Sequence, residues 1–276
     1  MKKNFTNVLV ALAMIIMFFP ACKKNNIGKT NANNVDLKKL SGQIGTTFYK
    51  SITGSYGSVD VSKGIKSPFA ASASGHKGLV LNDIPSLCGF VVDTTYNYTV
   101  LPPADHVPSA TDTTRKYYGH FHFVYTCDAG LVNGYNVADS VAYEESGFNF
   151  LNRSALAQNY WVKALDNTYK VVSMDGSVST YDGRFKPYSE IGSSMEGIYY
   201  LTGLKVDFSS GTADIISGKA AFTIRVTPVI SAVQQPPAYT DYYGILEYLG
   251  NHKAKLTING SSAYLVDLIT GESTVY

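Results

Sequence analysis

The stretch FVVDTTYNYTV, residues 90–100, decides the fold class of this chain. Its even positions carry apolar, aromatic and threonine side chains, and its odd positions include Asp93 and Asn97. Neighbouring side chains of a β-strand point to opposite faces, so this alternation predicts a half-buried strand. The same period recurs with the odd positions apolar in 117–127, and with the even positions apolar in 198–208 and 222–226.

Dipeptides that favour tight turns separate these stretches, namely Asn133-Gly134, Asp175-Gly176, Ser210-Gly211 and Asn259-Gly260. They predict hairpins over 168–183 and 253–269. Strands joined by such short turns must be antiparallel. We therefore expect an all-β fold, a single antiparallel, meander-rich sheet that forms a β-sandwich or an open barrel, with a short N-terminal helix.

The helix is expected over 35–52, where Leu37, Leu40, Ile44 and Phe48 recur at helical spacing. Gly42 and Gly45 each weaken it by about 1 kcal/mol, and Gly45 is the point where we expect it to break. A short helical turn is predicted over 154–159. Long loops are predicted over 101–114 and 229–240.

The N-terminus has the pattern of an export signal. Met1-Lys2-Lys3 is positive, residues 8–19 are almost wholly apolar, and Ala21 precedes Cys22. The apolar run is shorter than the about 20 residues that span a bilayer. Residues 1–22 resemble the signal of bacterial lipoproteins, which implies removal of 1–21 as a signal peptide and lipidation, for example with palmitate, at Cys22.

This resemblance predicts where the protein resides. Residues 22–34 are polar and predict a flexible tether, and 35–276 predict a single β-rich domain. Lys23 stands where an aspartate would imply retention at the inner membrane. We expect the protein in the cell envelope, anchored to the outer membrane, on its periplasmic or its external side.

The charge and the cysteines fit this compartment. The full chain has 23 Lys and Arg against 21 Asp and Glu, and the signal segment removes two lysines, so the mature chain is formally neutral. A neutral chain without basic runs argues against a nucleic-acid partner. Cys88 and Cys127 remain as an even pair, which predicts a disulfide in an oxidising compartment, although two buried free thiols are the alternative.

His120 and His122 are the sharpest chemical feature, because both side chains project from one face of a strand. They could be two ligands of zinc or a similar ion in a hydrolase, with a third from Glu144, Glu145 or Asp128. The alternative is a pair of polar residues on the solvated face. The common nucleotide, serine-hydrolase and metalloprotease motifs do not occur, so we lean towards a non-catalytic protein and predict no cofactor.

Tyrosine is abundant, with 21 residues beside a single tryptophan. Tyr160, Trp161, Tyr200 and Tyr243 are candidates for a glycan-binding or peptide-binding platform, or they are ordinary strand aromatics. An apolar ligand under a curled sheet is another possibility. We therefore expect a lipid-anchored binding or scaffolding protein, with a ligand-binding lipoprotein for glycans or apolar molecules as the alternative and a metal-assisted hydrolase as the outsider.

Overall fold

The computed structural model describes residues 36–55, 59–66, 87–102, 112–186, 192–230 and 238–276. The predicted signal peptide, Cys22 and the tether lie outside the described residues, as do 103–111 and 231–237 of the two predicted loops. Residues 36–276 form one compact unit. No helix among the described residues is long and apolar enough to cross a membrane.

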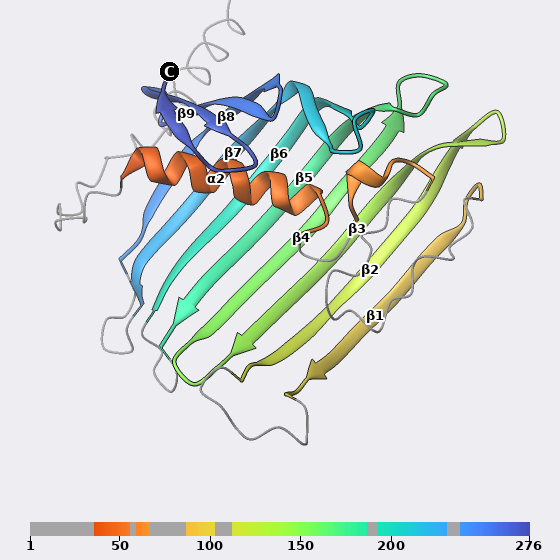
Figure 1. Ribbon diagram of the computed structural model, residues 1–276. Helices are drawn as coiled ribbons and strands as arrows, with labels where there is room; N and C mark the ends of the chain where they lie inside the picture. Colours follow the sequence, from red (N-terminus) through yellow and green to blue (C-terminus); the bar gives the residue numbers. More distant parts are fainter. Residues whose placement is uncertain (1–35, 56–58, 67–86, 103–111, 187–191, 231–237) are drawn as a thin grey trace, which may run out of the picture. The chain divides into compact units, whose positions relative to one another are not determined.

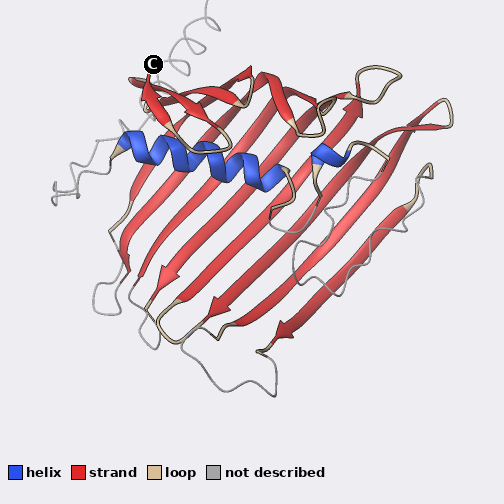
Figure 2. Cartoon of the chain, in the orientation of Figure 1, coloured by secondary structure: helices blue, strands red, loops and turns tan. Residues whose placement is uncertain are grey.

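One antiparallel sheet of eleven strands dominates the described chain (Figures 1 and 2). The strands pair in chain order, each with the next, and no pairing joins β1 to β11, so the sheet is open. The helical elements are α2 (Leu37–Ile52) and the short η1 (Val61–Lys63). The strands are β1 (Val91–Val100), β2 (Thr114–Asp128), β3 (Leu131–Ser146), β4 (Leu151–Ala164), β5 (Val171–Phe185), β6 (Gly192–Asp207), β7 (Asp214–Ile230), β8 (Thr240–Gly250), β9 (Lys253–Ile258), β10 (Ser262–Asp267) and β11 (Ser273–Val275).

This architecture confirms the expected all-β, antiparallel meander with a short N-terminal helix. Helix α2 lies across one face of the sheet, which we call the helix face (Figure 1). The opposite face is called the far face. Long alternating strands produce the two faces directly, because each strand sends every second side chain to the helix face, where Phe121, Val137, Tyr160, Tyr199 and Phe222 are buried.

Helix α2 is continuous, so the predicted break at Gly45 is wrong. Asp36 caps its first turn by accepting from the backbone N–H groups of Lys38 and Lys39. Phe48 fills the space between helix and sheet, with its ring centroid 5.2 Å from that of Tyr199. Burial of this apolar stripe stabilises the helix more than its glycines weaken it.

The two helix glycines serve close packing instead. A Cβ on Gly42 would overlap the carbonyl oxygen of Gly271, and one on Gly45 would lie 2.8 Å from Cγ1 of Val266. The helix can approach β10 and the turn after it only because both side chains are absent. This approach also allows the Ser41 and Ser273 hydroxyls to form a buried 2.6 Å hydrogen bond.

Several local predictions are wrong. Residues 154–159 belong to β4 and form no helical turn. The predicted hairpin over 168–183 is absent, because β5 runs straight through Asp175-Gly176 as a bulge. Gly176 has φ 137°, and a Cβ there would overlap the carbonyl oxygen of Asn159. This dipeptide therefore supplies the unusual backbone of a bulge rather than of a turn.

Other turn predictions divide in the same way. The 253–269 hairpin is confirmed as β9 and β10, and Ser210-Gly211 lies between β6 and β7. Asn133-Gly134 instead lies inside β3. The apolar positions of 117–127 and 222–226 face the core as predicted, apart from the exposed Cys127.

The prediction for 198–208 is half wrong. A bulge around Gly203, with φ 57°, changes which face β6 presents. Leu204 and Val206 are buried, whereas Ile198 and Tyr200 project from the far face and are exposed.

Candidate functional site

The far face carries a shallow trough across β2, β3, β4 and β5. Tyr118, Ala142, Ala155 and Tyr181 form one row, in which each residue pairs with the next across neighbouring strands. The two tyrosines stand at the ends of the row, and the two alanines lie between them. These residues line a hollow of about 280 Å³.

The floor of the trough is made of small side chains. The next row along the strands is Ser140, Ala157 and Ser179, which also line the hollow. Because strands lie about 4.8 Å apart, the backbones of Tyr118 and Tyr181 are about 14 Å apart across the trough. Two aromatic walls thus flank a flat floor of methyl and hydroxyl groups that a ligand can approach closely.

An ion-pair cluster closes one end of the trough. Glu144 lies 3.3 Å from Nζ of Lys116 and 3.0 Å from Nε of Arg153, one strand away on each side. Partial burial acts to raise the pKa of Glu144, but the hydrogen bonds from Arg153 and Lys116 hold it below its usual value. The charged groups of Lys116, Glu144 and Arg153 therefore pair with one another at the end of the trough.

The small-residue floor continues in the other direction through Ala138, Asn159 and Ser177, which form a third row. Trp161 follows two residues beyond Asn159 and is 51% exposed. From Ala155 to Trp161 the floor extends for about 20 Å along the strand. The trough is therefore a track with an aromatic residue at its far end.

His120 and His122 lie on the β2 side of this track, beside β1. His120 Nε2 is 2.8 Å from one carboxylate oxygen of Asp93, and His122 Nδ1 is 3.0 Å from the other. An ionised carboxylate only accepts hydrogen bonds, so each imidazole donates one N–H to it. These hydrogen bonds, with that from His122 the larger and that from His120 second, lower the pKa of Asp93.

The structure does not bring any of the three candidate third ligands to this junction. The three proposed third ligands lie elsewhere. Glu144 and Glu145 pair with Lys116 and Arg115, four and five residues before His120, and Asp128 is six residues beyond His122. Among the described residues, no group of three or more His, Cys, Asp or Glu side chains is arranged to hold a metal ion. Metal binding by His120 and His122 stays a prediction.

The four candidate aromatics do not form one platform. Tyr160 faces the helix side and is buried, and burial raises the pKa of its phenol far above the usual value. Trp161, Tyr200 and Tyr243 project from the far face and are more than half exposed. Trp161 and Tyr200 lie near the track, whereas Tyr243 lies on β8, beyond β7.

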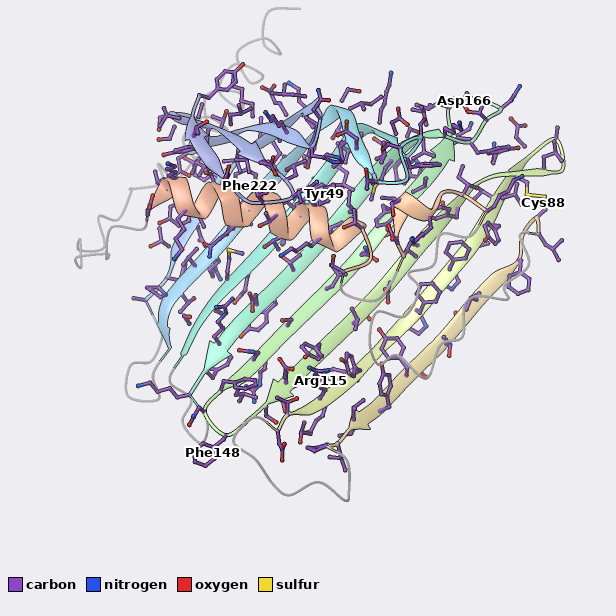
Figure 3. The ribbon with its side chains drawn as sticks, viewed as in Figure 1. Tyr49, Cys88, Arg115, Phe148, Asp166 and Phe222 are labelled. Atoms are coloured by element: carbon purple, nitrogen blue, oxygen red, sulfur yellow. A yellow bond between two sulfur atoms is a disulfide. The ribbon has the colours of Figure 1, made fainter. Side chains whose placement is uncertain are left out.

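The predicted disulfide is present. Cys88 and Cys127 are bridged, with their Cα atoms 5.6 Å apart, next to the turn between β2 and β3 (Figure 3). Figure 3 shows Cys88 at one end of the long strands and Arg115 at the other. The bridge therefore fastens the start of β1 to the end of the sheet away from the Glu144 cluster.

The aromatic walls of the trough were missed by sequence reasoning. Tyr118 and Tyr181 have no common motif, and only the strand register places them in one row. The sequence held one partial signal, which is the pair of small residues Ala155 and Ala157, two positions apart on β4. No family model, curated protein sequence or solved structure matches this chain.

Proposed function

We propose that this chain is a lipid-anchored protein of the bacterial cell envelope whose β-domain binds a saccharide in the far-face trough. The observation that carries the proposal is the row Tyr118, Ala142, Ala155 and Tyr181, in which two aromatic rings flank a small-residue floor. The lipid anchor rests on the resemblance of residues 1–22 to lipoprotein signals.

Saccharides suit this surface because a sugar ring has both apolar C–H faces and a rim of hydroxyl groups. Tyrosine combines an apolar ring with a polar hydroxyl, so it can pack on the C–H face and still hydrogen-bond. Ser140 and Ser179 on the floor and Asn159 farther along offer further donors and acceptors. The hollow is near the lower end of the size range of ligand sites, which fits one or two sugar units.

The trough is also open to solvent along its length and at the end away from the Glu144 cluster, rather than enclosed. An open track suits a polymer whose chain continues beyond the bound units, whereas an enclosed pocket suits a small free molecule. Trp161 and Tyr200 stand farther along the same face and provide contacts for such a continuation.

Binding rather than catalysis is proposed because of the residues that line the trough. They are alanine, serine, glycine, threonine, valine, leucine and tyrosine, and none of them carries a carboxylate, imidazole or thiol. Hydrolysis of a glycosidic bond ordinarily needs two carboxyl groups at a defined separation. The carboxylate of Glu144, at one end of the trough, is engaged in ion pairs.

The test is isothermal titration calorimetry of the purified protein against soluble oligosaccharides from glucans, xylans, mannans and peptidoglycan. Tyr118→Ala and Tyr181→Ala should each weaken binding about fivefold, because each removes an aromatic contact of about 1 kcal/mol. Tyr239→Ala is the matched control, since Tyr239 is 53% exposed and Tyr118 57% exposed, but Tyr239 packs on Arg225 outside the trough.

A second pair of variants separates shape from aromatic contact. Ala157→Leu should block the floor and abolish binding, whereas Thr223→Leu, on the same face outside the trough, should leave it unchanged. Equal affinities for wild type and both tyrosine variants would refute the trough. Labelling of cells with a fatty-acid analogue, compared with a Cys22→Ser variant, tests the anchor separately.

A further inference from the structure

Strand β1 is one edge of the sheet, and its outer side has no partner strand in the part of the chain that the structure describes. It is ten residues long. A long edge strand with free backbone groups is a template for pairing with another strand. The backbone groups on this side can be identified from the register.

The backbone N–H of Tyr125 donates to the carbonyl of Phe90. In an antiparallel pair, hydrogen-bonded residues alternate with residues whose backbone groups point away. Even-numbered residues of β1 therefore bond to β2. The odd-numbered residues, Val91, Asp93, Thr95, Asn97 and Thr99, direct their N–H and C=O groups outward.

Strand β1 lacks the features that normally prevent edge pairing. Its sequence, VVDTTYNYTV, has no proline and no lysine, and it is rich in β-branched and aromatic residues. Its one charged side chain, Asp93, is held on β2 by hydrogen bonds from His120 and His122. The edge is thus nearly neutral, and its single charge does not project freely from it.

We propose that two copies of this chain pair edge to edge through β1, antiparallel, with a two-fold axis at Thr95. The outward backbone groups then meet as Val91 with Thr99 of the second copy, Asp93 with Asn97, and Thr95 with Thr95. Threonine pairs and Asp–Asn hydrogen bonds are favourable cross-strand neighbours. Five outward residues on each chain form about ten backbone hydrogen bonds in this register.

Charge and strand length disfavour the registers whose two-fold axes lie two residues to either side. With the axis two residues earlier, Asp93 would face Asp93 of the second copy, and like charges directly opposite are unfavourable. With the axis two residues later, Asp93 would face Leu101, beyond the end of β1. Only the axis at Thr95 places the carboxylate opposite an amide and keeps the paired residues within the strand.

The other edge of the sheet argues for a closed dimer rather than a filament. Strand β11 has three residues, Ser273–Val275, so head-to-tail pairing of β1 with β11 would be limited to a few hydrogen bonds. Symmetric pairing of β1 uses ten residues on each side and consumes the edge. Isologous contacts of this kind end at two copies.

The test is cysteine cross-linking of the full, detergent-purified protein, in which Cys88 and Cys127 are already bridged. Thr95→Cys places the new thiol opposite itself across the axis, with Cα atoms about 5.5 Å apart, within disulfide reach. Thr99→Cys is the control, because its two copies would be about 27 Å apart in the same register. After mild oxidation, Thr95→Cys should form a covalent dimer on a non-reducing gel and Thr99→Cys should not.

Light scattering provides the second measurement. The wild-type protein should have the mass of two chains, and Thr95→Lys, which puts two like charges at the axis, should reduce it to one while keeping the wild-type circular dichroism spectrum. A single-chain mass for the wild type at its highest soluble concentration would overturn the proposal. So would cross-linking of Thr99→Cys to the same extent as Thr95→Cys.

Discussion

Gly42→Ala should destabilise the protein, although alanine is the better helix former. In an exposed helix this change stabilises by about 1 kcal/mol. In α2 the added Cβ would overlap the carbonyl oxygen of Gly271, a backbone atom that cannot rotate away. The helix must therefore move off the sheet, at a cost of about 1–3 kcal/mol for overpacking.

Movement of the helix also strains the buried hydrogen bond between Ser41 and Ser273, which contributes about 1 kcal/mol. The net loss is about 2 kcal/mol after the gain in helix propensity. For a domain of this size, that corresponds to a fall in Tm of roughly 4–8 °C.

Differential scanning calorimetry of Gly42→Ala beside Gln43→Ala measures this loss. Gln43 is the neighbouring, exposed position, where alanine should change Tm by no more than about 1 °C. A Gly42→Ala variant that melts at or above the wild-type temperature would refute the close approach of α2 to the turn at Gly271.

Three further outcomes follow from the disulfide and the titrating groups. Replacing both Cys88 and Cys127 with serine opens a link between residues 39 positions apart and should lower the unfolding free energy by about 4 kcal/mol in urea titrations. Hydrogen bonds from two imidazoles hold the pKa of Asp93 in the folded protein below its usual value of 3.8. The ionised carboxylate therefore stabilises the fold above pH 3.8, and this stabilisation is lost as the pH falls through the lower pKa of the folded state. Asp93→Asn should melt below wild type at neutral pH, and the difference between the two melting temperatures should vanish in strong acid. Burial, followed by the charge of Asp214, raises the pKa of Tyr49 from 10.0 to about 12, so stability should fall between pH 10 and 12 as the unfolded chain ionises first, and Tyr49→Phe should flatten that fall in alkaline melting curves.

The fold class was predictable because one physical rule governs most of the chain. Period-two alternation identified the strands at 117–127 and 222–226, and their buried sets are as predicted apart from the exposed Cys127. The rule fails where a strand contains a bulge. Gly203 inserts one into β6, so Tyr200 and Leu204 have the same parity in sequence and lie on opposite faces.

Glycine dipeptides were ambiguous for a related reason. Asn259-Gly260 forms a hairpin, whereas Asp175-Gly176 forms a bulge, although both supply a backbone with positive φ. The difference depends on the neighbouring strand: the carboxylate of Asp175 accepts the backbone N–H of Gly203 on β6. A contact between residues so far apart in sequence leaves no local signal.

The candidate site was the least predictable feature, since it consists of rows across strands. Histidines two residues apart were visible in the sequence, but their partner Asp93 belongs to β1 and was assigned only a solvated position. The trough walls likewise come from β2 and β5. Strand register is fixed by turns, bulges and burial together, and a single sequence does not reveal it.

The proposed edge pairing would bring the troughs of two copies onto one surface, which affects the choice of ligand. A two-fold axis between antiparallel edge strands is perpendicular to the sheet, so the far faces of both copies become one continuous surface. Strand β2 of each copy would then be separated from its counterpart by two copies of β1, about 14 Å across the sheet. Two troughs this close could hold two stretches of one long polysaccharide, and the second contact would be intramolecular. Linked sites of this kind strengthen binding by a factor of about 10² to 10⁴ for a chain that reaches both, and by nothing for a short oligosaccharide. A dimeric protein would therefore prefer polymer over fragment, and Thr95→Lys would remove that preference while leaving affinity for the fragment intact.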